Sequence, residues 1–174
     1  MVLVFAGCGR IAFDPLTPPD APPDAATDAT RTACDGVAPA GCIVADCPAV
    51  PSCVLYCSYA QATWNGARVE CQARGGDLAS VSTQAALACI VATRGASPGA
   101  WIGLTQGTAA TPDTGWTWLS GAAFAMTGWN TGEPNDDGST PGIEDMAEQC
   151  GALVPGGFND GPCTDVGHWA CQVP

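Results

Sequence analysis

Acidic and amide side chains are concentrated in one polar segment of the chain, residues 127–149. The segment reads TGWNTGEPNDDGSTPGIEDMAEQ and has neither the period of an amphipathic helix nor the alternation of a strand. It is too long for a passive connection in a compact domain, and loops of this length are usually functional or disordered. Its carboxylate and amide oxygens suit a hard cation such as calcium, which takes oxygen ligands in flexible geometry. The loop is therefore a candidate cation site.

The net charge of the chain narrows the classes of ligand. Seventeen acidic residues stand against five arginines and no lysine, which gives a formal charge of −12. Such a chain repels nucleic acid and anionic lipid, so neither is expected as a partner. An acidic excess suits a cation instead. Four of the acids belong to a proline-rich N-terminal stretch and only keep it solvated: Asp14, Asp20, Asp24 and Asp28.

Catalysis finds little support in the residue types. His168 is the only histidine, and no nucleophile with a neighbouring base can be identified. We therefore expect a binding protein rather than an enzyme.

Eleven cysteines in 174 residues indicate an oxidising compartment, because a cytosolic thiol pool would keep them reduced. We predict disulfides rather than zinc sites, since zinc favours close cysteine or histidine pairs and most of these spacings are wide. Residues 34–53 hold four cysteines beside glycine and proline, with few large apolar side chains. Disulfides must hold this segment, which is either a small appended knot or the entry hairpin of the main domain.

Two helices are predicted early in the folded part. Thr63 can cap the first, and Gly75 and Gly76 end it. Ser82 can cap the second, after a short strand at residues 78–81. Each helix has one apolar stripe that faces the core: Trp64, Ala67 and Cys71 in the first, and Ala86, Leu87, Ile90 and Val91 in the second.

Strands dominate after Gly99. Aromatic and β-branched runs broken by turn residues predict them at AWIGLT, GWTWLS, GAAFAM, CGALV and HWACQV. Two helices followed by short strands predict an α+β domain with an antiparallel sheet. All six tryptophans fall at apolar positions and are assigned to the core: Trp64, Trp101, Trp116, Trp118, Trp129 and Trp169.

The N-terminal residues 1–8, MVLVFAGC, form a short apolar run that ends in small residues and Cys8. The run resembles the lipobox of bacterial lipoproteins, which implies cleavage before Cys8 and acylation of its thiol. It lacks a basic segment, has Phe5 where such motifs carry Leu, Val or Ile, and is too short for a membrane span. A truncated ordinary signal is the alternative. Residues 9–33 are rich in proline and aspartate and predict an extended tether.

Six motifs in order resemble the C-type lectin-like domain. They are W-x2-A-x3-C-x3-G-G-x-L at residues 64–78, WIGL at 101–104, W-x-W at 116–118, EPN at 133–135, FND at 158–160 and WAC at 169–171. The resemblance places this domain at residues 54–174. It implies an α+β fold with two helices, antiparallel sheets, a long irregular binding loop and disulfide staples.

The resemblance also implies two disulfides, Cys71–Cys171 and Cys150–Cys163. Six cysteines then remain besides Cys8, and they can pair in fifteen ways that the sequence does not distinguish. These six are Cys34, Cys42, Cys47, Cys53, Cys57 and Cys89.

A calcium site that also binds sugar is the main functional implication of the resemblance. Two vicinal hydroxyls of the sugar would complete the coordination, and in this family EPN goes with equatorial 3- and 4-hydroxyls, as in mannose, whereas QPD goes with galactose. The peptide bond before Pro134 would be cis. The residues implied as calcium and carbohydrate ligands are Glu133, Asn135, Glu148, Asn159 and Asp160.

Three positions depart from the family pattern. FND replaces the commoner WND and keeps the ligands. The stretch before Glu148 is longer than in the simplest members, so Glu144 is an alternative ligand; Glu148 is preferred because it precedes Cys150 by two residues. Gln106 stands where an acid would be expected after WIGL, so a solvated loop is favoured over an auxiliary calcium site made of Asp136, Asp137, Glu144 and Asp145.

Calcium-dependent binding of mannose-type carbohydrate, without catalysis, is the predicted function. The alternative is a calcium-stabilised protein-recognition module on the same fold, with a protein partner and no sugar binding. An enzyme, by analogy with formylglycine-generating enzymes on a related fold, would need reactive cysteines. The expected location is extracellular or at the cell surface, and acylation of Cys8 would make the chain an outer-membrane lipoprotein.

Overall fold

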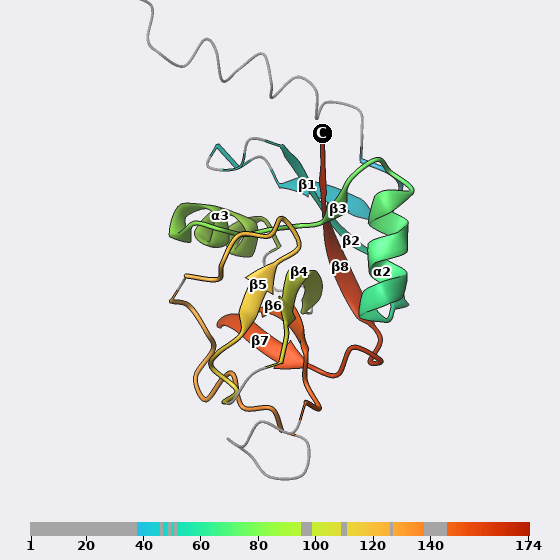
Figure 1. Cartoon of the computed structure of the whole chain (residues 1–174). Coiled ribbons are helices and arrows are strands. Elements are labelled where there is room, and N and C mark those ends of the chain that lie inside the picture. The colour runs from blue at the N-terminus through green and yellow to red at the C-terminus, as the bar shows by residue number, and fades with distance from the viewer. Residues whose placement is uncertain are drawn as a thin grey trace, which may run out of the picture.

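The computed structural model describes residues 38–45, 47–48, 50, 52–94, 99–108, 111–125, 127–137 and 146–174. The expectations for Cys8, the tether and Cys34 lie outside these residues. The described part forms one eight-stranded sheet with two helices (Figure 1). The strands are β1 (Cys42–Ala45), β2 (Cys53–Ala62), β3 (Asp77–Leu78), β4 (Ala100–Gln106), β5 (Trp116–Trp118), β6 (Cys150–Val154), β7 (Gly157–Gly161) and β8 (Gly167–Val173).

The sheet follows the order β1-β2-β8-β4-β6-β7, with β3 added to β8 and β5 to β4. Most pairs are antiparallel, as expected, but β4 and β8 run parallel, with Trp101 beside Trp169. The predicted α+β fold is confirmed, and its sheet is mixed rather than wholly antiparallel. Long stretches of chain separate these two strands, so no hairpin turn dictates their relative direction. The entry strand β1 pairs with β2 as a hairpin.

Helix α2 (Trp64–Gln72) has the predicted boundaries and buried face. The Thr63 hydroxyl accepts the Gly66 backbone N–H, and Trp64, Ala67 and Cys71 are buried. The chain leaves the helix through Gly75, whose φ of 81° lies in the left-handed region that favours glycine. The Trp64 indole N–H donates to the carbonyl of Ile102 at 2.8 Å, which fixes the helix against β4.

Helix α3 (Gln84–Arg94) begins one residue later than predicted. Thr83, not Ser82, caps it, because the Thr83 hydroxyl accepts the Ala86 backbone N–H at 3.1 Å. The predicted stripe of Ala86, Leu87 and Ile90 is buried, whereas Val91 is only half-buried.

Two predicted strands are shorter than expected or absent. The strand at residues 78–81 is reduced to β3, because beyond it the Ala79 N–H bonds to Ala170 while the Ala79 carbonyl accepts from Gly103. The run GAAFAM makes only an isolated bridge between Ala123 and Thr117. The Phe124 N–H nevertheless donates to the Trp116 carbonyl at 3.3 Å, and the Phe124 ring packs against Trp118, Trp129 and Phe158.

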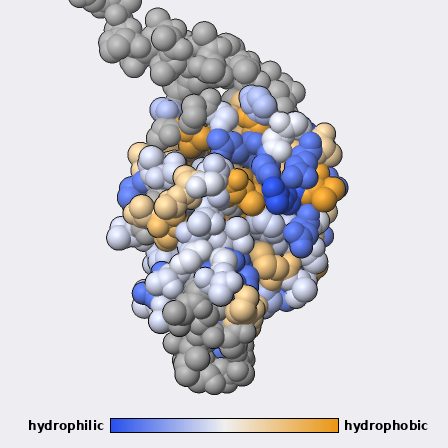
Figure 2. Space-filling view, viewed as in Figure 1, coloured by the Kyte–Doolittle hydropathy of each residue, from blue (hydrophilic) through white to orange (hydrophobic). Residues whose placement is uncertain are grey.

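Apolar side chains fill two clusters inside the domain. One lies around α3, β5 and Phe158, and the other around α2 and Trp169. Five of the six tryptophans are buried and Trp129 is half-buried, which agrees with their assignment to the core. On the face shown in Figure 2, hydrophobic residues are scattered among hydrophilic ones.

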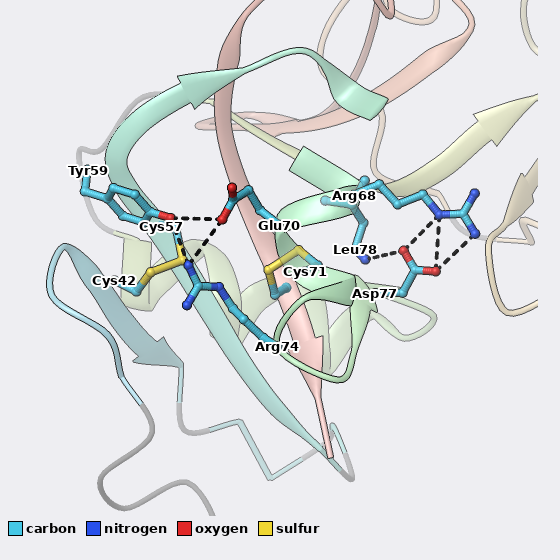
Figure 3. Close-up of a disulfide and its surroundings, with 10 residues drawn as sticks. Cys42, Cys57, Tyr59, Arg68, Glu70, Cys71, Arg74, Asp77 and Leu78 are labelled. Atoms are coloured by element: carbon cyan, nitrogen blue, oxygen red, sulfur yellow. Dashed lines mark hydrogen bonds and ion pairs between the residues drawn. A yellow bond between two sulfur atoms is a disulfide. The ribbon is translucent and has the colours of Figure 1, made fainter. Parts of the chain in front are cut away.

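Disulfides link segments of the described chain that lie apart in the sequence. Cys71–Cys171 joins α2 to β8 and Cys150–Cys163 joins β6 to the turn after β7, as the resemblance implied. The structure adds Cys42–Cys57, drawn in Figure 3, and Cys47–Cys89. Cys53 is disulfide-bonded as well. These bonds exclude zinc ligation by the nine cysteines involved.

Candidate functional site

The polar loop is anchored beside β7 at the end of the domain away from the C-terminus (Figure 1). The Asn130 N–H donates to the Phe158 carbonyl, and the Phe158 N–H donates to the Gly128 carbonyl, both at 2.8 Å. A side chain at Gly157 would place its Cβ 2.0 Å from the Gly128 carbonyl oxygen, so this approach requires glycine. The pairing brings the EPN triplet next to the FND triplet.

An aromatic floor supports this end of the loop. The Trp129 ring packs edge-on against Trp116 and Phe158, with centroid separations of 5.0 and 6.0 Å. Phe158 is fully buried, and its ring also contacts Trp118 and Phe124. These ring contacts hold the start of the loop, at Trp129, against the strand β7 that carries Phe158.

Asp160 connects β7 to the EPN triplet. Its carboxylate is almost fully buried and accepts the backbone N–H of Asn135 at 3.1 Å and that of Asp136 at 2.9 Å. The Asn159 amide donates to the backbone carbonyl of Asp160. The peptide bond between Glu133 and Pro134 is cis, as the resemblance implied.

Glu148 lies against the other side of the same loop. Its carboxylate accepts the Asp137 N–H at 2.8 Å, and its own N–H donates to the Asp136 carboxylate at 2.8 Å. These hydrogen bonds join Asn135 and Asn159 to Asp160, and join Glu148 to the same loop through Asp136 and Asp137. The alternative ligand Glu144 lies outside the described residues.

The electrostatics of the cluster favour a bound cation. Burial first, then a hydrogen bond with Asp160 and the charges of Asp160, Glu148 and Asp137, raise the pKa of Glu133 from 4.5 to about 7. Burial is also the main cause that raises the pKa of Glu148. Within the described residues, Glu133 Oε2 and Asn135 Oδ1 are buried without a hydrogen-bond partner. Buried oxygens left without a donor are costly, and a cation removes that cost.

The donor set fits calcium better than a transition metal. It combines carboxylate and amide oxygens, without sulfur or imidazole, which is the preference of a hard cation. In the part of the chain that the structure describes, no group of three or more His, Cys, Asp or Glu side chains converges into a metal cage. Two of the five candidates are asparagines, and the Asp160 carboxylate is engaged by backbone N–H groups.

The raised pKa of Glu133 predicts a pH dependence for the calcium-free protein. The folded state holds this proton up to about pH 7, whereas the unfolded chain loses it near 4.5. Stability is therefore lost as the pH rises through this window, and the thermal midpoint in chelator should increase on acidification from about pH 7.5 to about 5. Glu133→Gln should reduce this slope; an unchanged slope in that variant would contradict the assignment to Glu133.

Gln106 and Asp136, the residues that bear on an auxiliary calcium site, are both buried in the structure. Gln106 is buried, and its amide N–H groups donate to the carbonyls of Pro112 and Thr114 at 3.1 and 2.8 Å. Its carbonyl accepts from the Gln149 amide at 2.9 Å. Asp136 is fully buried, a position that sequence reasoning assigned to a solvated loop. Glu144 and Asp145 lie outside the described residues.

His168 and the cavity near the C-terminus, two other features of the described residues, lie apart from the five candidate calcium ligands. The His168 ring nitrogen Nδ1 lies 3.1 Å from the Ala60 carbonyl. A cavity of about 490 Å³ lies near β3 and the C-terminus, lined in part by Ser80, Leu119 and Gln172, and contains none of the five candidate residues. No described helix is both long and apolar enough to cross a membrane.

Comparison with known proteins identifies relatives for most of the chain. Residues 60–173 match the model of the lectin C-type domain. The mouse C-type lectin domain family 4 member G is 36% identical over 121 residues, which cover 67% of this chain and 38% of that relative. The chain therefore spans well under half of that relative's length.

Solved structures share the fold. The C-type lectin domain of murine dendritic cell inhibitory receptor 2, crystallised with an N-glycan, matches with a TM-score of 0.60 and 25% identity, over 78% of this chain and 97% of that one. The herring type II antifreeze protein matches with a TM-score of 0.57 and 23% identity, over 70% and 90% of the two chains. The same fold thus occurs in proteins with different described roles.

Proposed function

Because this chain belongs to the C-type lectin domain family, a family of binding domains, we propose that it binds carbohydrate through one calcium ion. The observation that carries the proposal is the pair of buried oxygens, Glu133 Oε2 and Asn135 Oδ1, that have no donor among the described residues. They lie in a carboxylate cluster that raises the pKa of Glu133 to about 7. The proposed ligands are Glu133, Asn135, Glu148, Asn159 and Asp160.

Two of the proposed ligands, Glu133 and Asn135, would also contact the sugar directly. Calcium bound here would offer coordination positions to two neighbouring sugar hydroxyls. Glu133 accepts the proton of one hydroxyl, and the Asn135 amide donates to the oxygen of the other. The order of acid and amide in the triplet therefore selects the orientation of the hydroxyl pair.

A mannose-type sugar is the proposed ligand class. The intact EPN triplet supports it, since in this family EPN goes with equatorial 3- and 4-hydroxyls. The murine structural relative crystallised with an N-glycan is consistent with it. None of the residues from Asn135 to Gln149 is aromatic, whereas galactose binders of this family tend to carry a ring after the triplet.

Exchange of the triplet tests this selectivity. The double variant Glu133→Gln and Asn135→Asp places the acid and amide in the QPD order and should reverse the preference from mannose to galactose in competition assays. Glu70→Gln is a suitable control because Glu70 is exposed on α2. Unchanged selectivity in the double variant would show that the triplet does not set it.

Calcium titration of the full chain by calorimetry, with and without mannose, tests the proposal as a whole. One calcium per chain and sugar binding that chelator abolishes are the expected results. A protein that captures a protein partner, but binds no glycan on an array in millimolar calcium, would instead be a recognition module on the same fold.

The arrangement of the chain is proposed to display the domain outside the cell. The disulfides of the described part are consistent with an oxidising location. We propose residues 1–8 as signal or lipobox, 9–33 as tether, 34–53 as the Cys-rich entry and 54–174 as the binding domain. Acylation at Cys8 would cluster the domains on a membrane, and clustering raises the avidity of weak single sites.

A further inference from the structure

Asp136, the residue directly after the EPN triplet, is a charged side chain with no exposed surface. Burying a carboxylate is costly unless hydrogen bonds satisfy it. Asp136 Oδ1 accepts the Glu148 N–H at 2.8 Å, and Oδ2 accepts the Met146 N–H at 3.1 Å. Its backbone has a φ of 44°, in the left-handed region that aspartate tolerates better than most residues.

The backbone of Asp136 makes a third connection. Its N–H donates to Asp160 Oδ2 at 2.9 Å. One residue is therefore bonded to the segment that carries Glu148 and to the strand that carries Asn159 and Asp160, while it follows Asn135 directly in the chain.

The state of its oxygens separates Asp136 from Glu133 and Asn135, whereas the carboxylate of the proposed ligand Asp160 also accepts backbone N–H groups. Glu133 Oε2 and Asn135 Oδ1 are buried without a donor among the described residues, whereas both carboxylate oxygens of Asp136 accept a backbone N–H. Charge-assisted bonds of this kind are among the stronger hydrogen bonds in proteins.

We propose that Asp136 is a positioning residue that assembles the calcium site before the ion binds, and that it is not itself a ligand. The inference rests on the proposed function for its effect on calcium. Hydrogen bonds also hold the neighbouring segment, since the Gln106 N–H donates to the Gln149 carbonyl at 3.0 Å and the Gln149 amide donates back to the Gln106 side chain at 2.9 Å.

Hydrogen exchange of the full, unmodified chain in calcium-free buffer is the first test. The amides of Met146 and Glu148 should be protected, because the buried Asp136 carboxylate accepts both. Exchange of these amides as fast as in an unfolded peptide would overturn the proposal, and this measurement needs no variant to fold.

Asp136→Asn is the second test, with Asp137→Asn as a matched control that removes a charge from the exposed neighbour. The asparagine NH2 group cannot accept an N–H, so exchange at Met146 or Glu148 should accelerate in calcium-free buffer. Calcium affinity measured by calorimetry should fall about 10- to 100-fold, the usual cost of losing a supporting residue. The control should retain the protection of both amides.

The outcomes distinguish positioning from ligation and from failure of the proposed function. Lost calcium affinity with unchanged calcium-free exchange in Asp136→Asn would make Asp136 a ligand and overturn the proposal. Absence of calcium binding by the unmodified protein would contradict the proposed function, while accelerated exchange in Asp136→Asn would still support the positioning role.

Discussion

Replacement of Asp160 by alanine is expected to abolish calcium binding and calcium-dependent sugar binding together. The carboxylate is 1% exposed and accepts the N–H groups of Asn135 and Asp136, so its loss leaves two buried donors without an acceptor. It also removes one of the proposed calcium ligands. Calcium affinity should fall by more than about 100-fold, beyond the usual effect of a supporting residue.

Two further variants separate the loss of a calcium ligand from the loss of loop structure and from the loss of any acidic charge. Asn159→Ala removes a proposed ligand but leaves the Asp160 carboxylate on the loop, so it should lose calcium while the loop amides stay protected from exchange. Asp165→Ala removes one exposed acid from the turn after β7 and should bind calcium as the unmodified chain does. Sugar binding that survives in Asp160→Ala would refute the assignment of the site.

Removal of the Cys71–Cys171 disulfide is expected to have the largest effect on stability. Both cysteines are fully buried, and the bond joins α2 to β8 across 100 residues of sequence. On the chain-entropy model a closed loop of that length contributes about 4 to 5 kcal/mol. The double variant Cys71→Ala and Cys171→Ala should therefore lower the thermal midpoint by about 10 °C or more.

The Cys42–Cys57 disulfide provides the matched comparison. It closes a separation of 15 residues between β1 and β2, for which the same model gives about 3 kcal/mol. Removing this pair should destabilise the protein less than removing the Cys71–Cys171 pair, as measured by denaturant unfolding. Equal or reversed losses would show that loop length does not govern the stability of this domain.

The surroundings of α2 explain why its disulfide is well placed. Arg68 forms an ion pair with Asp77 at 3.1 Å, and Arg74 donates to the Tyr59 hydroxyl at 2.8 Å (Figure 3). These groups are partly exposed, so the ion pairs contribute little by themselves. The buried Cys71–Cys171 disulfide, by contrast, joins this helix covalently to β8.

Features that depend on local chemistry can be predicted from the amino-acid sequence. Thr63 caps α2 and Trp64, Ala67 and Cys71 share one face of it, because capping and helical period involve residues a few positions apart. The motif order was sufficient to predict the family, the two disulfides of Cys71 and Cys150, and the neighbourhood of Glu133, Asn135, Glu148, Asn159 and Asp160.

Features that depend on distant partners became known only from the folded chain. The parallel pairing of β4 with β8, the packing of Phe124 on Phe158 and the pairing of Cys47 with Cys89 each depend on residues far away in the chain. The sequence favours a solvated loop for Asp136, because Gln106 stands where an auxiliary calcium site would need an acid. In the structure it is buried and its carboxylate accepts the backbone N–H groups of Met146 and Glu148, whose position no local pattern encodes.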